Sequence, residues 1–126
     1  MPLSNKILLD TNFLLIPADK KVDIFNEIER VVPGAQFHVL DKTINELKKI
    51  QNEQGGKHRE AAKLGMQLIE SKNIKIVPST SDRLVDEILI DMQDEYLIAT
   101  QDKELKKRLK KCLVLRQEKY VKLIEK

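Results

Sequence analysis

The regular alternation of short apolar runs with helix-like stretches is the strongest constraint on how this chain folds. Residues 7–9 form a continuous apolar run, which is typical of a strand buried on both faces of a parallel sheet. Between residues 20 and 32, apolar residues recur at the spacing of an amphipathic helix, and Pro33 and Gly34 end that stretch. The same change of period repeats along the chain.

This alternation predicts five strands separated by helices. The strands are expected at residues 7–9, 36–40, 74–77, 96–100 and 112–115. The helices are expected at residues 20–32, around Ile44, Leu47 and Ile50, at about 57–71, after a cap at Ser81, after a cap at Asp102, and as a short closing helix. Such an order favours an α/β domain with a parallel sheet and right-handed crossovers. At 126 residues, the chain is expected to form one domain over 1–126.

Composition excludes several classes of protein. No apolar run approaches the roughly 20 residues of a membrane-spanning helix. Residues 1–6 lack the apolar segment of a secretion signal, so we expect a cytoplasmic protein without membrane contact. With only Cys112, His38 and His58 available, the chain has neither an internal disulfide nor a Cys/His zinc site. Any metal must therefore be held by oxygen.

Charge is divided unevenly along the chain. Residues 102–126 hold ten Lys or Arg against four acids, a net of +6, whereas the whole chain is +3. Residues 1–101 are therefore net −3. A basic C-terminal surface could follow a phosphate backbone, although a solvated lysine-rich helix face produces the same pattern.

Four acids are expected at one edge of the predicted sheet, where the carboxyl ends of parallel strands bind ligands. Asp10 ends the first strand, and Asp102 follows the strand that ends at Thr100. Glu46 and Asp86 lie in the early turns of helices that follow other strands. Grouping these anions costs free energy through repulsion and desolvation unless a cation holds them. All-oxygen ligation selects Mg²⁺ or Mn²⁺.

Each acid also has a purely structural interpretation. Asp102 is a suitable helix N-cap, and Glu46 could complete a capping box that begins at Thr43. Asp86 could be an exposed helix acid. Asp10 is the hardest to dismiss, because it directly follows three apolar residues.

Four segments, in chain order, resemble the motifs of PIN-domain ribonucleases. They lie at residues 7–15, 43–47, 85–88 and 98–105. The resemblance covers nearly the whole chain from about Lys6, and residues 105–109 and 116–121 are most similar to single-domain archaeal PIN proteins and related ribosomal-RNA processing endonucleases. Toxin-type PIN proteins of toxin–antitoxin pairs are the nearest rival. The resemblance implies a PIN-like fold with a five-stranded parallel sheet flanked by helices on both faces.

The resemblance also implies site residues and a reaction. Asp10, Glu46, Asp86 and Asp102 match the acidic quartet that is expected to be catalytic and to bind the metal. Asn12 and Thr100 match its polar supports, while Glu87 and Asp91 remain alternatives to Asp86 because the third motif departs from the usual Asp-Asp. The implied reaction is Mg²⁺- or Mn²⁺-dependent hydrolysis of RNA that leaves 5′-phosphate and 3′-hydroxyl ends. The side chains expected to contact the RNA backbone are Lys103, Lys106, Lys107 and Lys110.

Other functions stay open at this point. The chain could act in ribosomal-RNA processing or RNA turnover, alone, as a homodimer or with a ribosome-assembly partner. It could instead be a toxin held by an antitoxin, or a PIN-like module that binds RNA or a partner without cutting. A response-regulator receiver domain is disfavoured because Pro78, rather than a phospho-accepting Asp, follows the middle strand. A dehalogenase-like phosphatase would need an acid where Asn12 stands.

Overall fold

The computed structural model describes residues 5–79 and 81–126, so the part of the secretion-signal expectation that concerns residues 1–4 lies outside it. The elements are β1 (Lys6–Leu9), α1 (Thr11–Leu14), α2 (Ile16–Lys20), α3 (Ile24–Val31), β2 (Gln36–Leu40), α4 (Asp41–Glu53), α5 (Gly56–Ser71), β3 (Lys75–Val77), α6 (Val85–Asp91), β4 (Leu97–Ala99), α7 (Lys103–Arg108), β5 (Lys111–Arg116) and β6 (Tyr120–Glu125). Among these residues, no helix is both long and apolar enough to cross a membrane.

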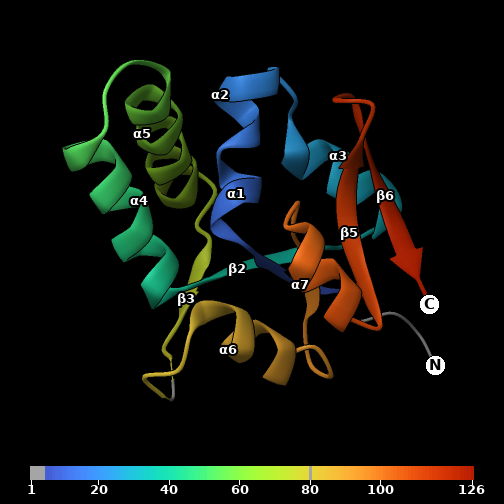
Figure 1. Ribbon diagram of the computed structural model, residues 1–126. Coiled ribbons are helices and arrows are strands. Elements are labelled where there is room, and N and C mark those ends of the chain that lie inside the picture. The colour runs from blue at the N-terminus through green and yellow to red at the C-terminus, as the bar shows by residue number, and fades with distance from the viewer. Residues whose placement is uncertain (1–4, 80) are drawn as a thin grey trace.

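One sheet runs through the molecule in the strand order β3-β2-β1-β4-β5-β6. The first five of these strands are parallel, as the sequence predicts, and β6 is antiparallel to β5. Helices cover both faces of the sheet, with α1 to α5 on one side and α6 and α7 on the other (Figure 1). The predicted α/β class and its parallel core are therefore confirmed.

The side chains of β1 show why its sequence is apolar at every position. Ile7 and Leu9 belong to the core beneath α1, α3, α4 and α5, whereas Leu8 belongs to the core beneath α6 and α7. All three side chains are fully buried. A strand covered on both faces needs apolar residues on both, because successive side chains point to opposite sides of the sheet.

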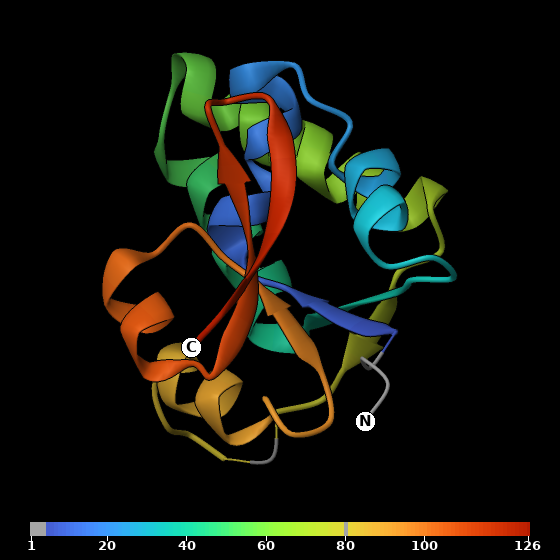
Figure 2. The ribbon, with the colours of Figure 1, turned by 90° about the vertical axis from the view of Figure 1, so that its right-hand side faces the viewer.

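The prediction of a short helix at the end of the chain is wrong, because residues 120–125 form strand β6. A hydrogen bond from Lys119 N to Arg116 O closes a tight turn, in which Gln117 and Glu118 have φ values of 53° and 54°. This turn sends the chain back along β5, and the two strands form the long hairpin at the centre of Figure 2. The sequence of β6 is too short for periodicity alone to distinguish a strand from a helix.

Several predicted helix starts also differ from the structure. Helix α6 begins at Val85 rather than at a Ser81 cap, and Ser81 Oγ instead accepts a hydrogen bond from Arg83 N at 3.3 Å. Helix α4 begins at Asp41, so Thr43 lies buried in its first turn and cannot cap it. The capping-box interpretation of Glu46 is therefore wrong. Helices α1 and α2 have no counterpart among the predicted elements, and the helix predicted over residues 20–32 begins only at Ile24.

Candidate functional site

A cleft of about 470 Å³ opens at the carboxyl ends of β1 and β4. Its walls come from the start of α1, from α4, from the start of α6 and from the residue that precedes α7. The residues that line it are Asp10, Thr11, Asn12, Leu15, Glu46, Leu84, Val85, Asp86 and Asp102. All four acids expected from the motifs thus face the same space, although they are separated by up to 92 positions in the chain.

Asp10 is held in a fixed position at the base of this cleft. Its side chain is only 7% exposed, and its Oδ1 accepts a hydrogen bond from Thr11 N at 2.8 Å. Its Oδ2 accepts hydrogen bonds from Thr100 Oγ1 at 2.7 Å and from Asn12 Nδ2 at 3.3 Å. Asn12 and Thr100, the two expected polar supports, therefore both contact this carboxylate.

Thr100 also connects Asp10 to the segment that carries Asp102. Its hydroxyl oxygen, which donates to Asp10, accepts a hydrogen bond from Asp102 N at 3.1 Å. Asp102 Oδ1 in turn accepts from Glu104 N at 2.9 Å and from Leu105 N at 3.1 Å, which confirms that this residue caps α7. Because both cap bonds use Oδ1, the cap leaves Oδ2 available to the cleft. The structural and functional interpretations of Asp102 are thus compatible.

Gln101 is a supporting residue whose contacts sequence reasoning missed. Its backbone N donates to Asn12 Oδ1 at 3.0 Å. Its side chain accepts from Leu115 N at 2.7 Å and donates to Leu115 O at 3.3 Å. The loop after β4 is therefore fastened both to α1 and to β5. The chain itself offers no signal for this role, because the two partners become neighbours only in the folded sheet.

Three of the cleft acids are destabilised as anions. Burial raises the pKa of Asp10, and the negative charges of Asp86 and Asp102 raise it further, although hydrogen bonds from Thr100 and Thr11 lower it in part. Burial likewise raises the pKa of Glu46, and the charge of Asp10 adds to that effect. Burial and the charge of Asp102 raise the pKa of Asp86. The cleft therefore favours a cation or a proton.

The donor set suits a hard divalent cation, but the acids do not close a cage around one. Across residues 5–79 and 81–126, no three His, Cys, Asp or Glu side chains are grouped closely enough to hold an ion by themselves. Mg²⁺ commonly keeps several waters and takes one or two carboxylates together with oxygens of a substrate phosphate. An open arrangement of carboxylates fits that mode of binding.

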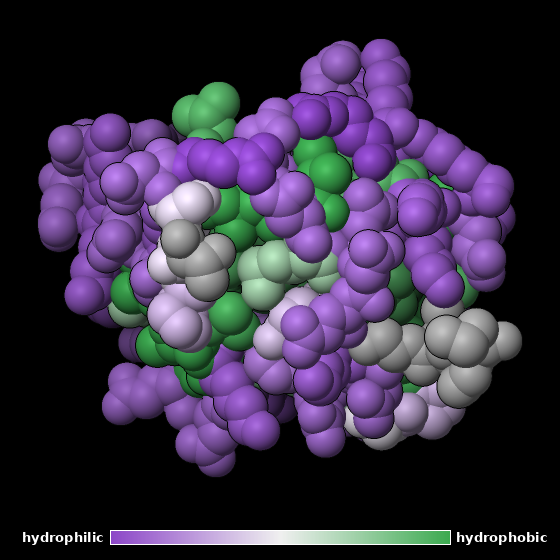
Figure 3. Space-filling model, turned by 90° about the horizontal axis from the view of Figure 1, so that it is seen from below, coloured by the Kyte–Doolittle hydropathy of each residue, from purple (hydrophilic) through white to green (hydrophobic). Residues whose placement is uncertain are grey.

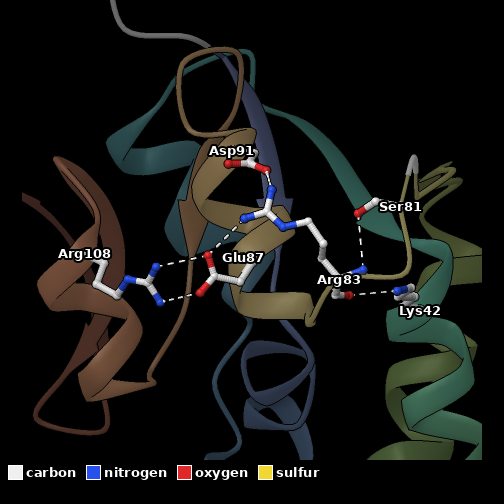
Figure 4. Close-up of polar contacts among 6 residues, drawn as sticks. All are labelled: Lys42, Ser81, Arg83, Glu87, Asp91 and Arg108. Atoms are coloured by element: carbon white, nitrogen blue, oxygen red, sulfur yellow. Dashed lines mark hydrogen bonds and ion pairs between the residues drawn. The ribbon is translucent and has the colours of Figure 1, made fainter.

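The two alternatives to Asp86 pair with arginines (Figure 4). Neither of them lines the cleft. The Glu87 carboxylate contacts both terminal nitrogens of the Arg108 guanidinium, at 2.8 and 3.1 Å, and Arg83 at 3.2 Å. The hydrogen bonds with Arg108 lower the pKa of Glu87. Asp91 also pairs with Arg83. Of these three acids, Asp86 is the one that lines the cleft.

The predicted RNA-contacting lysines lie along and just beyond α7, which starts next to the cleft. None of the four is among the residues that line it. Lys107 pairs with Glu104 at 3.3 Å, and Lys110 lies 4.0 Å from Asp94. Their contact with RNA remains a prediction.

Fold and cleft together define an α/β domain with an acidic site at the carboxyl edge of its sheet. The chain belongs to the PIN like domain family, whose profile matches residues 7–118. Among solved structures, 14 chains match. One of them is described as the PIN domain endonuclease Utp24, with a TM-score of 0.76 and 21% sequence identity over 96% of this chain and 92% of that one. At this identity the likeness establishes the fold. No curated protein sequence matches.

Thr100→Val tests the link between Asp10 and Asp102. Valine keeps the shape of the buried side chain but removes all three hydrogen bonds of the hydroxyl, which link it to Asp10 Oδ2, Asp102 N and Asn12 Nδ2. We expect the free energy of unfolding to fall by about 1–3 kcal/mol in urea titrations at pH 7. Thr100→Ser retains the hydroxyl and is the matched control. An equal loss in both variants would assign the effect to something other than the hydroxyl.

Proposed function

We propose that this protein is a metal-dependent endoribonuclease that hydrolyses RNA phosphodiester bonds in the acidic cleft. The observation that carries the proposal is the convergence of Asp10, Glu46, Asp86 and Asp102 on one cleft where their charges repel one another. Family membership supports a nuclease, as does the likeness to a PIN domain endonuclease. For the cellular role, the sequence resemblance supports ribosomal-RNA processing or RNA turnover.

All four acids would contribute ligand oxygens to Mg²⁺ or Mn²⁺. Asp10 offers a carboxylate whose orientation is fixed by three hydrogen bonds. Asp86 and Asp102 offer oxygens from the side of the cleft formed by α6 and α7, and Glu46 does so from α4. When bound, the ion supplies Lewis-acid chemistry, which activates water for attack and offsets the negative charge of the phosphate. The chain's own contribution is to fix the oxygens before RNA arrives.

Cleavage assays test this proposal directly. A structured and a single-stranded RNA would each be incubated with the protein and Mg²⁺, Mn²⁺ or EDTA. We expect internal cuts with either ion and none with EDTA, and the products should carry 5′-phosphate and 3′-hydroxyl ends. RNA binding without cutting in every condition would instead indicate a non-catalytic module.

Metal binding should also stabilise the fold, and the effect should depend on pH. The folded-state pKa values of Asp10, Glu46 and Asp86 are raised, so without metal the stability falls as pH rises from the ordinary values of 3.8 and 4.5 through the raised ones. At pH 7.5 an ion at ten times its Kd should add about 1.4 kcal/mol. That corresponds to a rise in Tm of about 5 °C.

Thermal unfolding with and without Mn²⁺ measures this effect. The gain in Tm should shrink as pH is lowered towards 4, because protons then occupy the carboxylates. Sodium chloride at equal ionic strength, in place of the Mn²⁺ salt, is the control for screening. An equal gain in an Asp10→Asn protein would place the ion outside the cleft.

A further inference from the structure

Leu84 is an apolar residue that is exposed to solvent at the mouth of the acidic cleft. It is 78% exposed, and it lines the cleft together with the four acids. On the face of the molecule seen from below in Figure 1, hydrophobic residues reach the surface in patches between hydrophilic ones (Figure 3). Isolated exposed apolar residues are ordinary on protein surfaces. Leu84 differs because it borders the space that a ligand of the acids would occupy.

Several polar contacts hold Arg83, the residue before Leu84 (Figure 4). Arg83 O accepts a hydrogen bond from Lys42 Nζ at 2.9 Å, and Arg83 N donates to Ser81 Oγ at 3.3 Å. The Arg83 guanidinium is held by ion pairs with Glu87 at 3.2 Å and with Asp91. The residue before Leu84 is therefore anchored through its backbone and its side chain to α4 and α6.

Leu84 is itself anchored on its other side. It is the N-cap residue of α6, and its carbonyl oxygen accepts a hydrogen bond from Ile88 N at 3.1 Å. Little conformational freedom of this backbone remains to be lost on binding, which favours an apolar contact here over one on a mobile loop.

The cleft thus combines two chemistries at close range. Carboxylates that favour a cation suit a phosphate held through that cation, while Leu84, Leu15 and Val85 provide apolar contacts beside it. A nucleotide carries the matching pair, a charged phosphate and a base with two apolar faces. Lys42, whose ammonium group lies next to the Arg83 carbonyl, adds positive charge on the same side.

We propose that Leu84 packs against the base of a nucleotide next to the phosphate that is cut, as a binding residue for single-stranded RNA. This inference rests on the proposed function to the extent that RNA must enter the cleft. The contact would not depend on base identity, because every base presents an apolar face. It would hold the strand in register without reading its sequence.

Leu84→Ser tests the contact, with Ile76→Ser as the matched control. Ile76 is the other large apolar side chain that is exposed in the described part of the chain, at 55%, and it lies on β3 outside the cleft. Both changes would be made in Asp10→Asn protein so that RNA is not cut during the measurement. Fluorescence anisotropy would follow the binding of a labelled single-stranded oligonucleotide in Mn²⁺.

We expect Leu84→Ser to weaken binding about tenfold, and Ile76→Ser to change it less than about twofold. Oligonucleotides with one abasic site at each position in turn identify the partner. The effect of Leu84→Ser should disappear when one particular base is missing. Persistence of the loss with every abasic oligonucleotide, or no loss at all, would overturn the proposal. So would sedimentation showing that Leu84→Ser separates a dimer of this chain.

Cleavage assays keep this inference distinct from the proposed function. In protein with Asp10 intact, Leu84→Ser should slow the cutting of single-stranded RNA. If that variant cuts RNA as well as the unchanged protein, the endonuclease stands and the base contact fails. If no RNA is cut but binding still depends on Leu84 and on one base, the base contact stands and the endonuclease fails.

Discussion

The Asp10→Asn protein should lose RNA cleavage by a factor on the order of 10³ while remaining folded. Asparagine keeps the size of the side chain but removes the negative charge and one of the two acceptor oxygens. The Thr100 hydroxyl, which donates to the carboxylate, can turn to accept from the new amide N–H, so only the hydrogen bond from Asn12 Nδ2 is lost. Initial rates with Mn²⁺, measured against the unchanged protein, test the prediction.

Stability separates a catalytic role of Asp10 from a structural one. Burial and the neighbouring charges raise the pKa of Asp10. Replacing its charge by a neutral amide should therefore leave the free energy of unfolding at pH 7, without metal, unchanged or slightly higher. That benefit should vanish at low pH, where the original carboxyl group is protonated. Asp19→Asn, at an exposed acid outside the cleft, is the matched control. Marked destabilisation by Asp10→Asn would show that the carboxylate is needed for the fold.

Gly65→Leu should destabilise the protein by about 3 kcal/mol. Gly65 is buried in α5, and a Cβ atom there would lie 3.1 Å from the backbone oxygen of Leu14 in α1. A leucine would force α5 away from the helix that begins directly after Asp10. Urea unfolding would measure the loss, and RNA cleavage by the remaining folded protein should fall as α1 shifts.

Gly55→Leu provides the control for this substitution. Gly55 has an ordinary extended backbone, and a Cβ atom added there would have nothing within 4 Å. Because Gly55 is the N-cap of α5, where leucine is less favourable than glycine, we expect its replacement to lower the free energy of unfolding by only about 1 kcal/mol. If Gly65→Leu unfolded at the same urea concentration as Gly55→Leu, α1 and α5 would not pack as closely as the structure shows.

The parallel core of the sheet could be predicted because its signals are local. The apolar run of β1 and the acid at its end place Asp10 at the edge where parallel strands end, and the cap at Asp102 marks the start of α7. The antiparallel β6 could not be predicted. Its turn places Gln117 and Glu118 at positive φ, without the Gly or Asn that usually signals such a turn.

The three acids of α6 show what could not be predicted from the sequence. Asp86, Glu87 and Asp91 lie on one short helix, and nothing in their spacing decides which of them faces the cleft. Arg108 and Arg83 decide it by pairing with Glu87 and Asp91, which leaves Asp86 on the cleft side. The contacts of Gln101 with Leu115 and of Lys42 with Arg83 could not be predicted either, because each joins residues that are far apart in the chain.

By itself, the sequence determined the alternation of strands and helices, the burial of β1 on both faces and the four acids expected at the edge of the sheet. These follow from periodicity and from the direction of parallel strands, which neighbouring residues encode. Only the tertiary structure decided the direction of β6, the position of Asp86 on the cleft, the close approach at Gly65 and the exposure of Leu84. Each of these depends on contacts between segments far apart in the chain, and such contacts exist only once the chain has folded.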